Sequence, residues 1–252
     1  MDNQDEINLN LLGNSDRYNQ DVRFDLSRNI LYTSFFSELF RDLEINCSYS
    51  EEAQVSTHLA SHSQNIFSIC SLNVQSLHAK FSELKNFLTT INNGPSVLDI
   101  IAISETWVKD FSLYNIDNYT LFGSSRPSGR GGGSAIYLHS SNTAKQLNNP
   151  IFFMPNIFEA TVIEINMKGK FKFLLVSIYR PNTHNDLTPG AQIDSFMQQL
   201  EICLEFLEKF NKPVIFAGDI NIDLLKSNDI NDPSTNLIDL FLSYGYIQTV
   251  YI

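Results

Sequence analysis

The chain has 252 residues, of which 43% are hydrophobic, so it is long and apolar enough to bury the core of one or two domains. Its formal net charge of -11 at pH 7 argues against nucleic-acid binding by bulk electrostatics, but leaves room for a locally basic groove or a metal that masks carboxylates. Three scattered cysteines fit neither a zinc site nor a disulfide framework.

The N-terminus has neither the basic nor the apolar region of a secretory signal, and the longest apolar runs are interrupted by polar or charged residues. We therefore expect an intracellular protein, in the nucleus or the cytoplasm, without a membrane partner. No pattern in the sequence indicates a protein partner.

Residues 1–65 differ in composition from the rest. They are rich in Asn, Ser, Asp and Glu, and residues 1–64 carry 11 acidic and 4 basic side chains. Apolar residues at roughly helical spacing over Ser27–Leu43 predict one amphipathic helix. His58 and His62 could share a helix face and bind a metal, but no acid lies between them as in a metalloprotease motif, which favours a polar linker. We predict an acidic, largely disordered tail over residues 1–65 and a folded domain over residues 66–252.

The folded domain opens with a strand, a helix and a second strand. An alternating segment, Ile66–Asn73, predicts a strand, and an apolar stripe over Ser82–Ile91 predicts a helix. Val97–Ser104 is a continuous apolar run, typical of a buried strand. A crossover of this length predicts a parallel or mixed sheet with helices on its faces.

The later elements are read from the same periodicities and turn signals. Asp194–Phe210 has the clearest apolar face of any predicted helix, and Lys212 and Pro213 separate it from a strand that begins at Val214. The other predicted segments are strands at Tyr119–Phe122 and Ala135–Leu138, a loop at Ser124–Gly133, a hairpin of Phe158–Ile165 and Lys170–Tyr179, a loop at Thr188–Gly190, a helix at Asn236–Leu242 and a strand over Tyr246–Ile252.

The segment Pro213–Asp223, PVIFAGDINID, places polar residues directly after an apolar strand. Alternate residues of an extended chain point to the same side, so Asp219 and Asn221 are expected to project together from the end of that strand. A carboxylate beside a carboxamide can hold and deprotonate a water, or bind a metal. A solvated turn is the alternative, because Asp, Gly and Asn are common turn residues.

Other polar side chains share this position just past a predicted strand. Asn73, Glu105 and Tyr179 each lie at or after a strand end, as do Asp219 and Asn221. Ligand sites of sheet-based folds gather at such ends. Mg²⁺ takes oxygen ligands, often one or two carboxylates with water and substrate phosphate, and a tyrosine can donate to a phosphate oxygen. The pattern therefore predicts a cation site that handles phosphate.

Five short segments carry a resemblance to a known group of enzymes. They are Ser71–Leu77 (SLNVQSL), Ile103–Trp107 (ISETW), Gly129–Leu138 (GRGGGSAIYL), Ser177–Asn182 (SIYRPN) and Ala217–Asn221 (AGDIN). In this order they resemble the endonuclease/exonuclease/phosphatase superfamily, most closely the apurinic/apyrimidinic-type endonuclease domain of non-LTR (LINE or jockey-type) retrotransposons. The resemblance covers residues 66–252 and implies an α/β fold, a four-layer α/β sandwich with two mixed sheets.

The resemblance also implies a role for each residue at the strand ends. Glu105 would be the principal ligand of Mg²⁺ or Mn²⁺, and Asn73 would support the metal and the phosphate. Tyr179 would hydrogen-bond the scissile phosphate. Asp219 would orient or deprotonate the attacking water, and Asn221 would help to position it. The implied reaction is metal-assisted hydrolysis of a phosphodiester that nicks one DNA strand.

Contacts to the DNA substrate are implied for Arg180, Asn182 and Arg130. For Arg130 and for Arg126, an ordinary solvated arginine is an equal alternative. The glycines of Gly131–Gly133 could cradle a phosphate, but no Lys-Ser/Thr follows them, so a flexible turn is the favoured interpretation.

The sequence departs from the family pattern at its C-terminal side. The resemblance implies an Asp-His pair in one of the last strands, and this sequence has none. We therefore expect the sandwich to be incomplete at the C-terminus, with an exposed sheet edge, and loss of one catalytic member to remove most activity. A non-catalytic retroelement remnant and a phosphatase of the same superfamily are the alternative functions.

Overall fold

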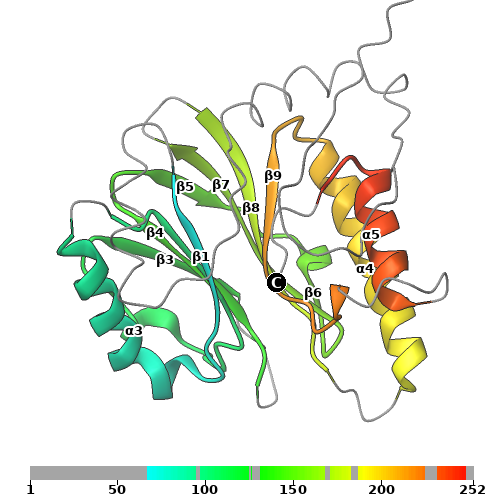
Figure 1. The fold of residues 1–252 in the computed structure, drawn as a ribbon, viewed down its shortest axis with the longest axis horizontal. Coiled ribbons are helices and arrows are strands. Elements are labelled where there is room, and N and C mark those ends of the chain that lie inside the picture. Colours follow the sequence, from blue (N-terminus) through cyan, green and yellow to red (C-terminus); the bar gives the residue numbers. More distant parts are fainter. Residues whose placement is uncertain are drawn as a thin grey trace, which may run out of the picture. The chain divides into compact units, whose positions relative to one another are not determined.

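The computed structural model describes residues 67–94, 97–124, 126, 131–167, 171–182, 187–224 and 232–247 (Figure 1). The predicted tail over residues 1–65, with its helix and its histidine pair, lies outside these residues, as do Arg130 and most of the strand predicted after Tyr246. Within the described part, no helix combines the length and the apolar character that crossing a membrane requires.

The first sheet contains β1 (Ile69–Asn73), β2 (Ile100–Ser104), β4 (Ser134–His139) and β3 (Tyr119–Ser124), in that spatial order. β1 runs parallel to β2, and β4 is antiparallel to both of its neighbours, so the sheet is mixed. Every residue of β2 is buried, which explains why this strand reads as an unbroken apolar run.

The second sheet has the order β5 (Thr143–Gln146), β7 (Phe158–Met167), β8 (Phe171–Tyr179) and β9 (Val214–Asp219), and the short β6 (Phe153–Met154) also pairs with β7. β8 and β9 are parallel and the other pairs are antiparallel. The predicted hairpin of β7 and β8 is confirmed. β5, β6 and the 3-10 turns η2 (Phe111–Leu113) and η3 (Pro150–Phe152) were not predicted, because segments this short carry little periodicity.

Helices cover the outer face of each sheet (Figure 1). α3 (Leu77–Asn92) packs its buried leucines against the first sheet, and α4 (Pro189–Glu208) and α5 (Pro233–Ser243) pack against the second. The inner faces of the two sheets share one apolar cluster, which includes Ile100 and Ile136 from the first and Ile163 and Phe173 from the second. The order helix, sheet, sheet, helix confirms the predicted four-layer sandwich with two mixed sheets.

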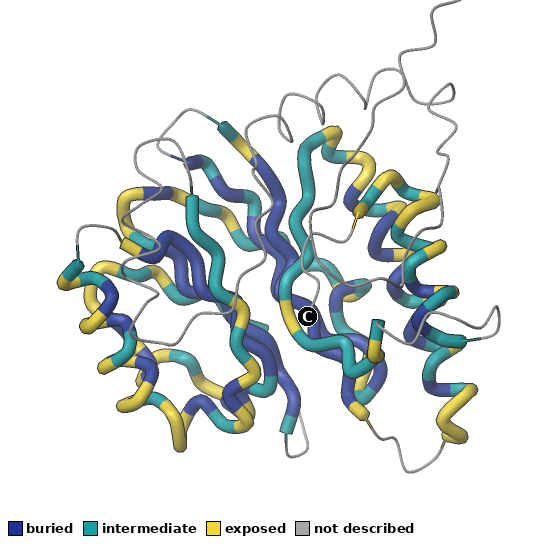
Figure 2. The backbone as a smooth tube through the Cα atoms, in the orientation of Figure 1, coloured by how far each residue is buried: buried dark blue, intermediate teal, exposed yellow. Residues whose placement is uncertain are grey.

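Burial follows this layered arrangement (Figure 2). Alternate residues of β2 serve different cores, since Ile100 faces the cluster between the sheets while Ile101 and Ile103 pack with α3. β9 is the last strand of its sheet among the described residues, and none of its residues is fully buried.

The three helices of the described residues begin earlier than predicted, because their first turns carry capping residues, and in α4 and α5 a proline, instead of apolar periodicity. The hydroxyl of Thr188 accepts a hydrogen bond from the Ala191 N–H at 3.3 Å, and Pro189 occupies the first turn, where its missing N–H costs nothing. The loop predicted at Thr188–Gly190 is therefore wrong. α5 begins in the same way, at Asp232 and Pro233.

Candidate active site

Two rows of paired residues, one from each sheet, meet where the strands end. In the first sheet Asn73 is paired with Ser104, and in the second Tyr179 is paired with both Glu159 and Asp219. Directly paired residues project to the same face of a sheet, so Tyr179, Glu159 and Asp219 share one face. β1 lies beside β9, across the gap between the sheets, which brings the two rows together.

Buried hydroxyls join the two sheets close to these rows. The Ser134 and Thr161 hydroxyl oxygens are 2.9 Å apart, and the Ser177 hydroxyl donates to the Ile103 carbonyl at 3.3 Å. All three hydroxyl-bearing residues are buried. The apolar cluster between the sheets therefore gives way to hydrogen-bonded side chains at the end where the polar rows lie.

Asn73 joins two carboxylates that come from different sheets. Its carboxamide nitrogen donates to Glu105 Oε1 at 2.8 Å and to Asp219 Oδ2 at 2.6 Å. Its carboxamide oxygen accepts the Gln75 N–H at 3.2 Å. The structure thus brings together three residues that lie far apart in the sequence, each at or next to the end of a strand.

Glu105 occupies an uncommon backbone conformation. Its φ is 56° and that of Trp107 is 55°, both in the left-handed region that residues other than glycine seldom adopt. The segment is held on one side by the start of α3, where the Ser76 and Leu77 N–H groups donate to the Glu105 and Thr106 carbonyls at 2.9 and 2.8 Å. The chain therefore turns sharply at the end of β2.

Tyr179 ends β8 and is 7% exposed. Its phenol interacts electrostatically with the Glu105 carboxylate. Burial raises the pKa of Tyr179, and the negative charges of Glu105 and Glu159 raise it further. The phenol therefore keeps its proton at neutral pH and can act as a hydrogen-bond donor.

The strand β9 ends at Asp219, and the extended conformation does not continue to Asn221. Asn221 has a φ of 51°, and its N–H donates back to Asp219 Oδ1 at 3.0 Å. Its carboxamide nitrogen donates to the Arg180 carbonyl at 2.7 Å. The two side chains are neighbours through a turn, and the alternation expected of a strand does not place them.

Arg180 lies inside the protein, with 5% of its surface exposed. Its guanidinium donates to the carbonyls of Ile220 and Asn221 at 2.5 Å each and to that of Pro181 at 3.4 Å. Burial lowers the pKa of this guanidinium. Arg180 therefore fixes the turn after Asp219, and its contact with a substrate stays a prediction.

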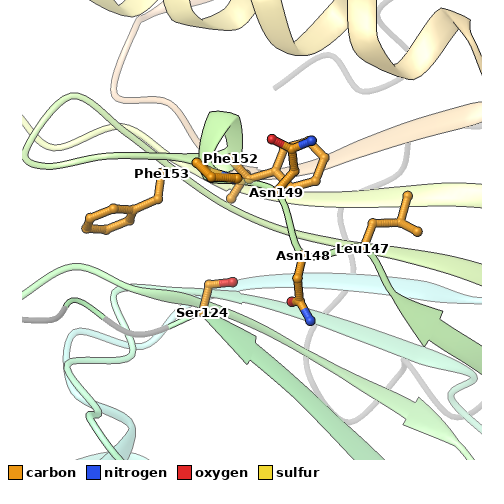
Figure 3. A pocket seen from close by; sticks show the side chains of 8 residues that line it. Ser124, Leu147, Asn148, Asn149, Phe152 and Phe153 are labelled. Atoms are coloured by element: carbon orange, nitrogen blue, oxygen red, sulfur yellow. The ribbon is translucent and has the colours of Figure 1, made fainter.

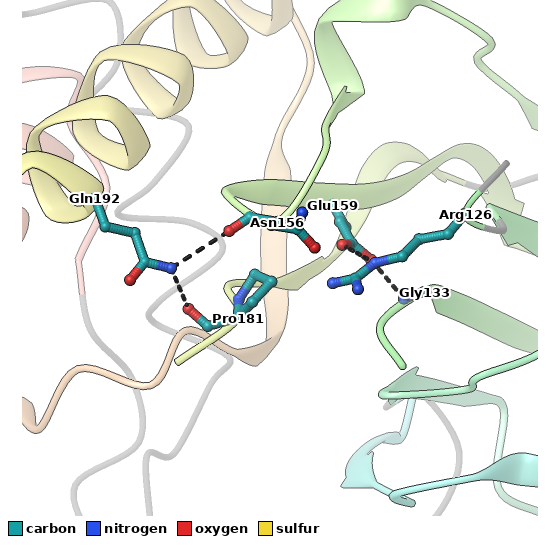
Figure 4. Close-up of polar contacts among 6 residues, drawn as sticks. All are labelled: Arg126, Gly133, Asn156, Glu159, Pro181 and Gln192. Atoms are coloured by element: carbon teal, nitrogen blue, oxygen red, sulfur yellow. Dashed lines mark hydrogen bonds and ion pairs between the residues drawn. The ribbon is translucent and has the colours of Figure 1, made fainter. Parts of the chain in front are cut away.

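Glu159 is a polar residue of this region that the sequence did not single out (Figure 4). It lies on β7 with 1% of its surface exposed, and Arg126 Nε contacts its Oε1 at 2.5 Å while the Gly133 N–H donates to its Oε2. Burial raises its pKa, against the opposing effects of the Gly133 N–H and the Arg126 charge. Only the strand register, which pairs it with Tyr179, shows that it belongs to the site.

The model of the endonuclease/exonuclease/phosphatase family matches residues 70–244, which include every residue of the site described above. The chain belongs to this family. No curated protein sequence matches the chain significantly.

Solved structures share the fold of this family member. The AP endonuclease LMAP from Leishmania major superposes with a TM-score of 0.55 and 13% identity, over 82% of this chain and 78% of that one. The 3′ phosphatase NExo from Neisseria, bound to a product DNA hairpin, gives a TM-score of 0.50 and 16% identity, over 71% of this chain and 72% of that one. At these identities the comparison shows the common fold.

The donor set of this family member fits a hard divalent cation. Among the described residues, no three His, Cys, Asp or Glu side chains gather into a group that could enclose a metal, so a closed zinc-type site is absent there. Glu105 and Asp219 instead supply two carboxylates that are linked through Asn73. Such a set suits a cation that keeps several waters and binds substrate phosphate as well.

A hollow of about 320 Å³ lies elsewhere on the domain (Figure 3). Asn73, Glu105 and Asp219 are not among its lining residues, so it does not define the site. Its lining residues are Ser124, Leu147, Asn148, Asn149, Pro150, Phe152, Phe153 and Ala160.

Proposed function

We propose that this family member hydrolyses phosphodiester bonds of DNA with the help of a divalent metal ion, and that it nicks one strand. One observation carries the proposal: the Asn73 carboxamide joins the Glu105 and Asp219 carboxylates, at 2.8 and 2.6 Å, where the two sheets meet. A carboxylate able to bind a cation then lies next to a carboxylate able to take a proton, which is what metal-assisted hydrolysis requires.

Glu105 is the proposed ligand of the metal, which we take to be Mg²⁺ or Mn²⁺. When bound, the ion supplies a positive charge that stabilises the charge developing on the phosphate and on the leaving oxygen. Asn73 keeps Glu105 in place, because its carboxamide is held between the two carboxylates. The Tyr179 hydroxyl, whose pKa is raised by burial and by the charges of Glu105 and Glu159, is the proposed hydrogen-bond donor to the scissile phosphate.

Asp219 is the proposed acceptor of the proton of the attacking water. Its carboxylate receives hydrogen bonds from Asn73 and from the Asn221 N–H, and these fix its direction. Arg180 and Asn221 hold the turn that follows it, through bonds between the two residues and to backbone carbonyls. Contacts of Arg130, Asn182 and Arg180 with the DNA backbone belong to the same proposal, and Asn182 is exposed.

The retroelement origin rests on the sequence motifs. The SETW and YRPN segments that contain Glu105 and Tyr179 favour the endonuclease branch found in non-LTR retrotransposons. A reverse transcriptase reading frame next to this coding sequence would support that origin. The division at residue 65 into a tail and a catalytic domain is part of this proposal.

A phosphatase acting on phosphate ends is the second candidate. The net charge of -11 favours it. To bind the terminal phosphate of a nucleic acid, an acidic protein needs fewer contacts with the negatively charged backbone than it needs to bind a long duplex. A non-catalytic remnant is the third candidate.

The test is relaxation of supercoiled plasmid in Mg²⁺ by the whole chain, by Glu105→Gln and by the control Glu83→Gln. Glu83 lies on the exposed side of α3, where 71% of its side chain is accessible and Lys80 pairs with it. We expect the parent and the control to nick, and Glu105→Gln to be at least about 100-fold slower.

A second substrate, an oligonucleotide with a 3′ phosphate, separates the alternatives. Release of phosphate without nicking identifies a phosphatase. Nicking by Glu105→Gln at the parent rate contradicts the assigned site, and absence of both activities from the folded parent identifies the remnant.

A further inference from the structure

Glu159 is buried among the residues of the candidate site. It lies on β7 next to Tyr179, which in turn pairs with Asp219 on β9. A carboxylate that is 1% exposed is costly unless it is paired and hydrogen-bonded. Here the Arg126 guanidinium contacts one carboxylate oxygen and the Gly133 N–H donates to the other, so the buried charge is both paired and hydrogen-bonded (Figure 4).

Gly133, whose N–H donates to Glu159, and the neighbouring Gly132 support the backbone next to Glu105. The Gly133 carbonyl accepts the Thr106 N–H at 3.3 Å, and the Gly132 carbonyl accepts the Trp107 N–H at 2.8 Å. Both glycines have positive φ, 85° and 70°. A Cβ on Gly133 would lie 2.4 Å from the Thr106 hydroxyl oxygen, so the two segments are in close contact and a side chain at this position would push them apart.

This support is needed because the Glu105 segment is strained. Glu105 and Trp107 both have φ near 55°, and such conformations persist only when neighbouring structure holds them. The start of α3 holds one side of the segment, through its N–H groups. Gly132 and Gly133, here called the glycine segment, hold the other side. Glu159 anchors this segment to the second sheet through Gly133, next to the hydrogen bonds between Ser134 and Thr161.

We propose that Glu159 is a positioning residue: through Gly133 it fixes the backbone of Thr106 and Trp107, and so sets the direction of the Glu105 carboxylate. This inference rests on the proposed function, in which Glu105 binds the metal. It also gives Gly132 and Gly133, which precede β4, a structural part in the site. Arg126 neutralises the buried charge of Glu159, and with 12% of its side chain exposed it is not the ordinary solvated arginine that the sequence offered as an alternative.

The test compares Glu159→Gln with Glu164→Gln in the full chain. Both glutamates lie on β7 and both form an ion pair, Glu159 with Arg126 and Glu164 with Lys212 at 2.7 Å, but Glu164 lies further along the strand, away from Gly133. Glutamine keeps the shape of the side chain and removes its charge, so each variant loses one ion pair and only the first disturbs the glycine segment.

The first measurement is amide hydrogen exchange without metal or DNA. In Glu159→Gln the amides of Thr106 and Trp107 should exchange at least about tenfold faster than in the parent, because a hydrogen bond to a charged acceptor is stronger than one to a neutral acceptor, whereas amides in the middle of β2 should not change. In Glu164→Gln the same amides should exchange at the parent rate. Parent exchange rates in a folded Glu159→Gln overturn the inference. If that variant does not fold, Arg126→Gln replaces it, with the same expectation and the same overturning result.

The second measurement titrates MnCl₂ into the protein and follows the fluorescence of Trp107, the only tryptophan of the chain. The half-saturating Mn²⁺ concentration should rise at least about tenfold in Glu159→Gln and stay unchanged in Glu164→Gln. An unchanged midpoint in Glu159→Gln overturns the inference. A parent that gives no response to Mn²⁺ counts instead against the proposed metal at Glu105, and the exchange measurement still decides whether Glu159 holds the segment.

Discussion

Asn73 is the residue on which the site depends most, because one carboxamide keeps two negative groups from different sheets within hydrogen-bond reach. Without its two N–H donors, Glu105 and Asp219 would face each other as like charges. Its third contact, from the Gln75 N–H to the carboxamide oxygen, decides which way the carboxamide points. The side chain is therefore fixed by three partners although the residue is exposed.

Asn73→Asp tests this dependence at constant shape. The change removes both donors and adds a third negative charge between two others, so we expect the nicking rate to fall about 100-fold or more, with little loss of stability because the residue is exposed. Asn86→Asp, the same charge change on an exposed position of α3, is the control and should keep the parent rate. Equal rates for the two variants would show that the carboxamide bridge plays no part in the reaction.

The sequence predicted four of the residues that the structure brings together in the candidate site, because each lies at or next to a strand end. Asn73, Glu105, Tyr179 and Asp219 could be placed by that rule alone, although not at their distances. Asn221 follows a turn that strand alternation does not describe. Glu159 could not be found at all, since an acid within a strand normally indicates a solvated face, and its burial follows from a register that no local pattern encodes.

At the scale of elements, strands were easier to locate than the beginnings of helices. The strands that carry the site are apolar and short, and their periodicity is clear. The helices begin in polar turns, where a hydroxyl or carboxylate caps the first N–H groups and a proline follows in two of the three cases. The Thr188-Pro189 pair has both the signature of a loop and that of a helix start, and the apolar face of α4 becomes regular only further along the chain.

Thr188→Ala should lower the free energy of unfolding by about 1 kcal/mol, because the Ala191 N–H loses its acceptor at the start of α4. Thr188→Ser keeps the hydroxyl and should recover most of the loss. Urea denaturation of the three proteins measures the difference. A Thr188→Ala protein with the same free energy of unfolding as the parent would mean that the packing of α4, and not its cap, determines where the helix begins.

At the scale of the whole domain, the site exists because two sheets pack face to face. Asn73 and Glu105 come from the first sheet, and Tyr179 and Asp219 come from the second, so neither sheet can form the site alone. The periodicity of apolar residues predicts the strands, but it does not predict that the two sheets pack face to face. That arrangement was predicted only from the resemblance to the family. The apolar cluster between the sheets, with Ile100 and Phe173 among its members, is what keeps the two halves of the site together.

The stability of the domain should fall at alkaline pH for a reason visible in its core. Burial raises the pKa of the Cys203 thiol from an ordinary value near 9 to about 12. A raised pKa means that the folded state holds this proton more tightly, so the contribution to stability is complete below about pH 9 and is lost as the pH rises towards 12. At about pH 10.5 the loss amounts to about 2 kcal/mol.

Cys203→Ala isolates this effect from the tyrosines that also titrate at high pH. The variant should be less stable than the parent at about pH 8, because it leaves a small cavity under α4, and the difference should shrink by about 2 kcal/mol at about pH 10.5. Urea denaturation at the two pH values gives both differences. A gap that stays constant with pH would show that the thiol of Cys203 ionises as readily in the folded protein as in the unfolded chain.

The most direct test of the central claim, that residues from both sheets act as one hydrolytic unit, is a double-mutant cycle on the plasmid-nicking rate in Mg²⁺. The four proteins are the parent, Glu105→Gln, Asp219→Asn and the double variant. Because Asn73 links the two carboxylates, each single change should cost about 100-fold or more, and the double variant should be little slower than the slower single variant. A double variant whose loss equals the product of the two single losses would contradict the account, since the two carboxylates would then act independently.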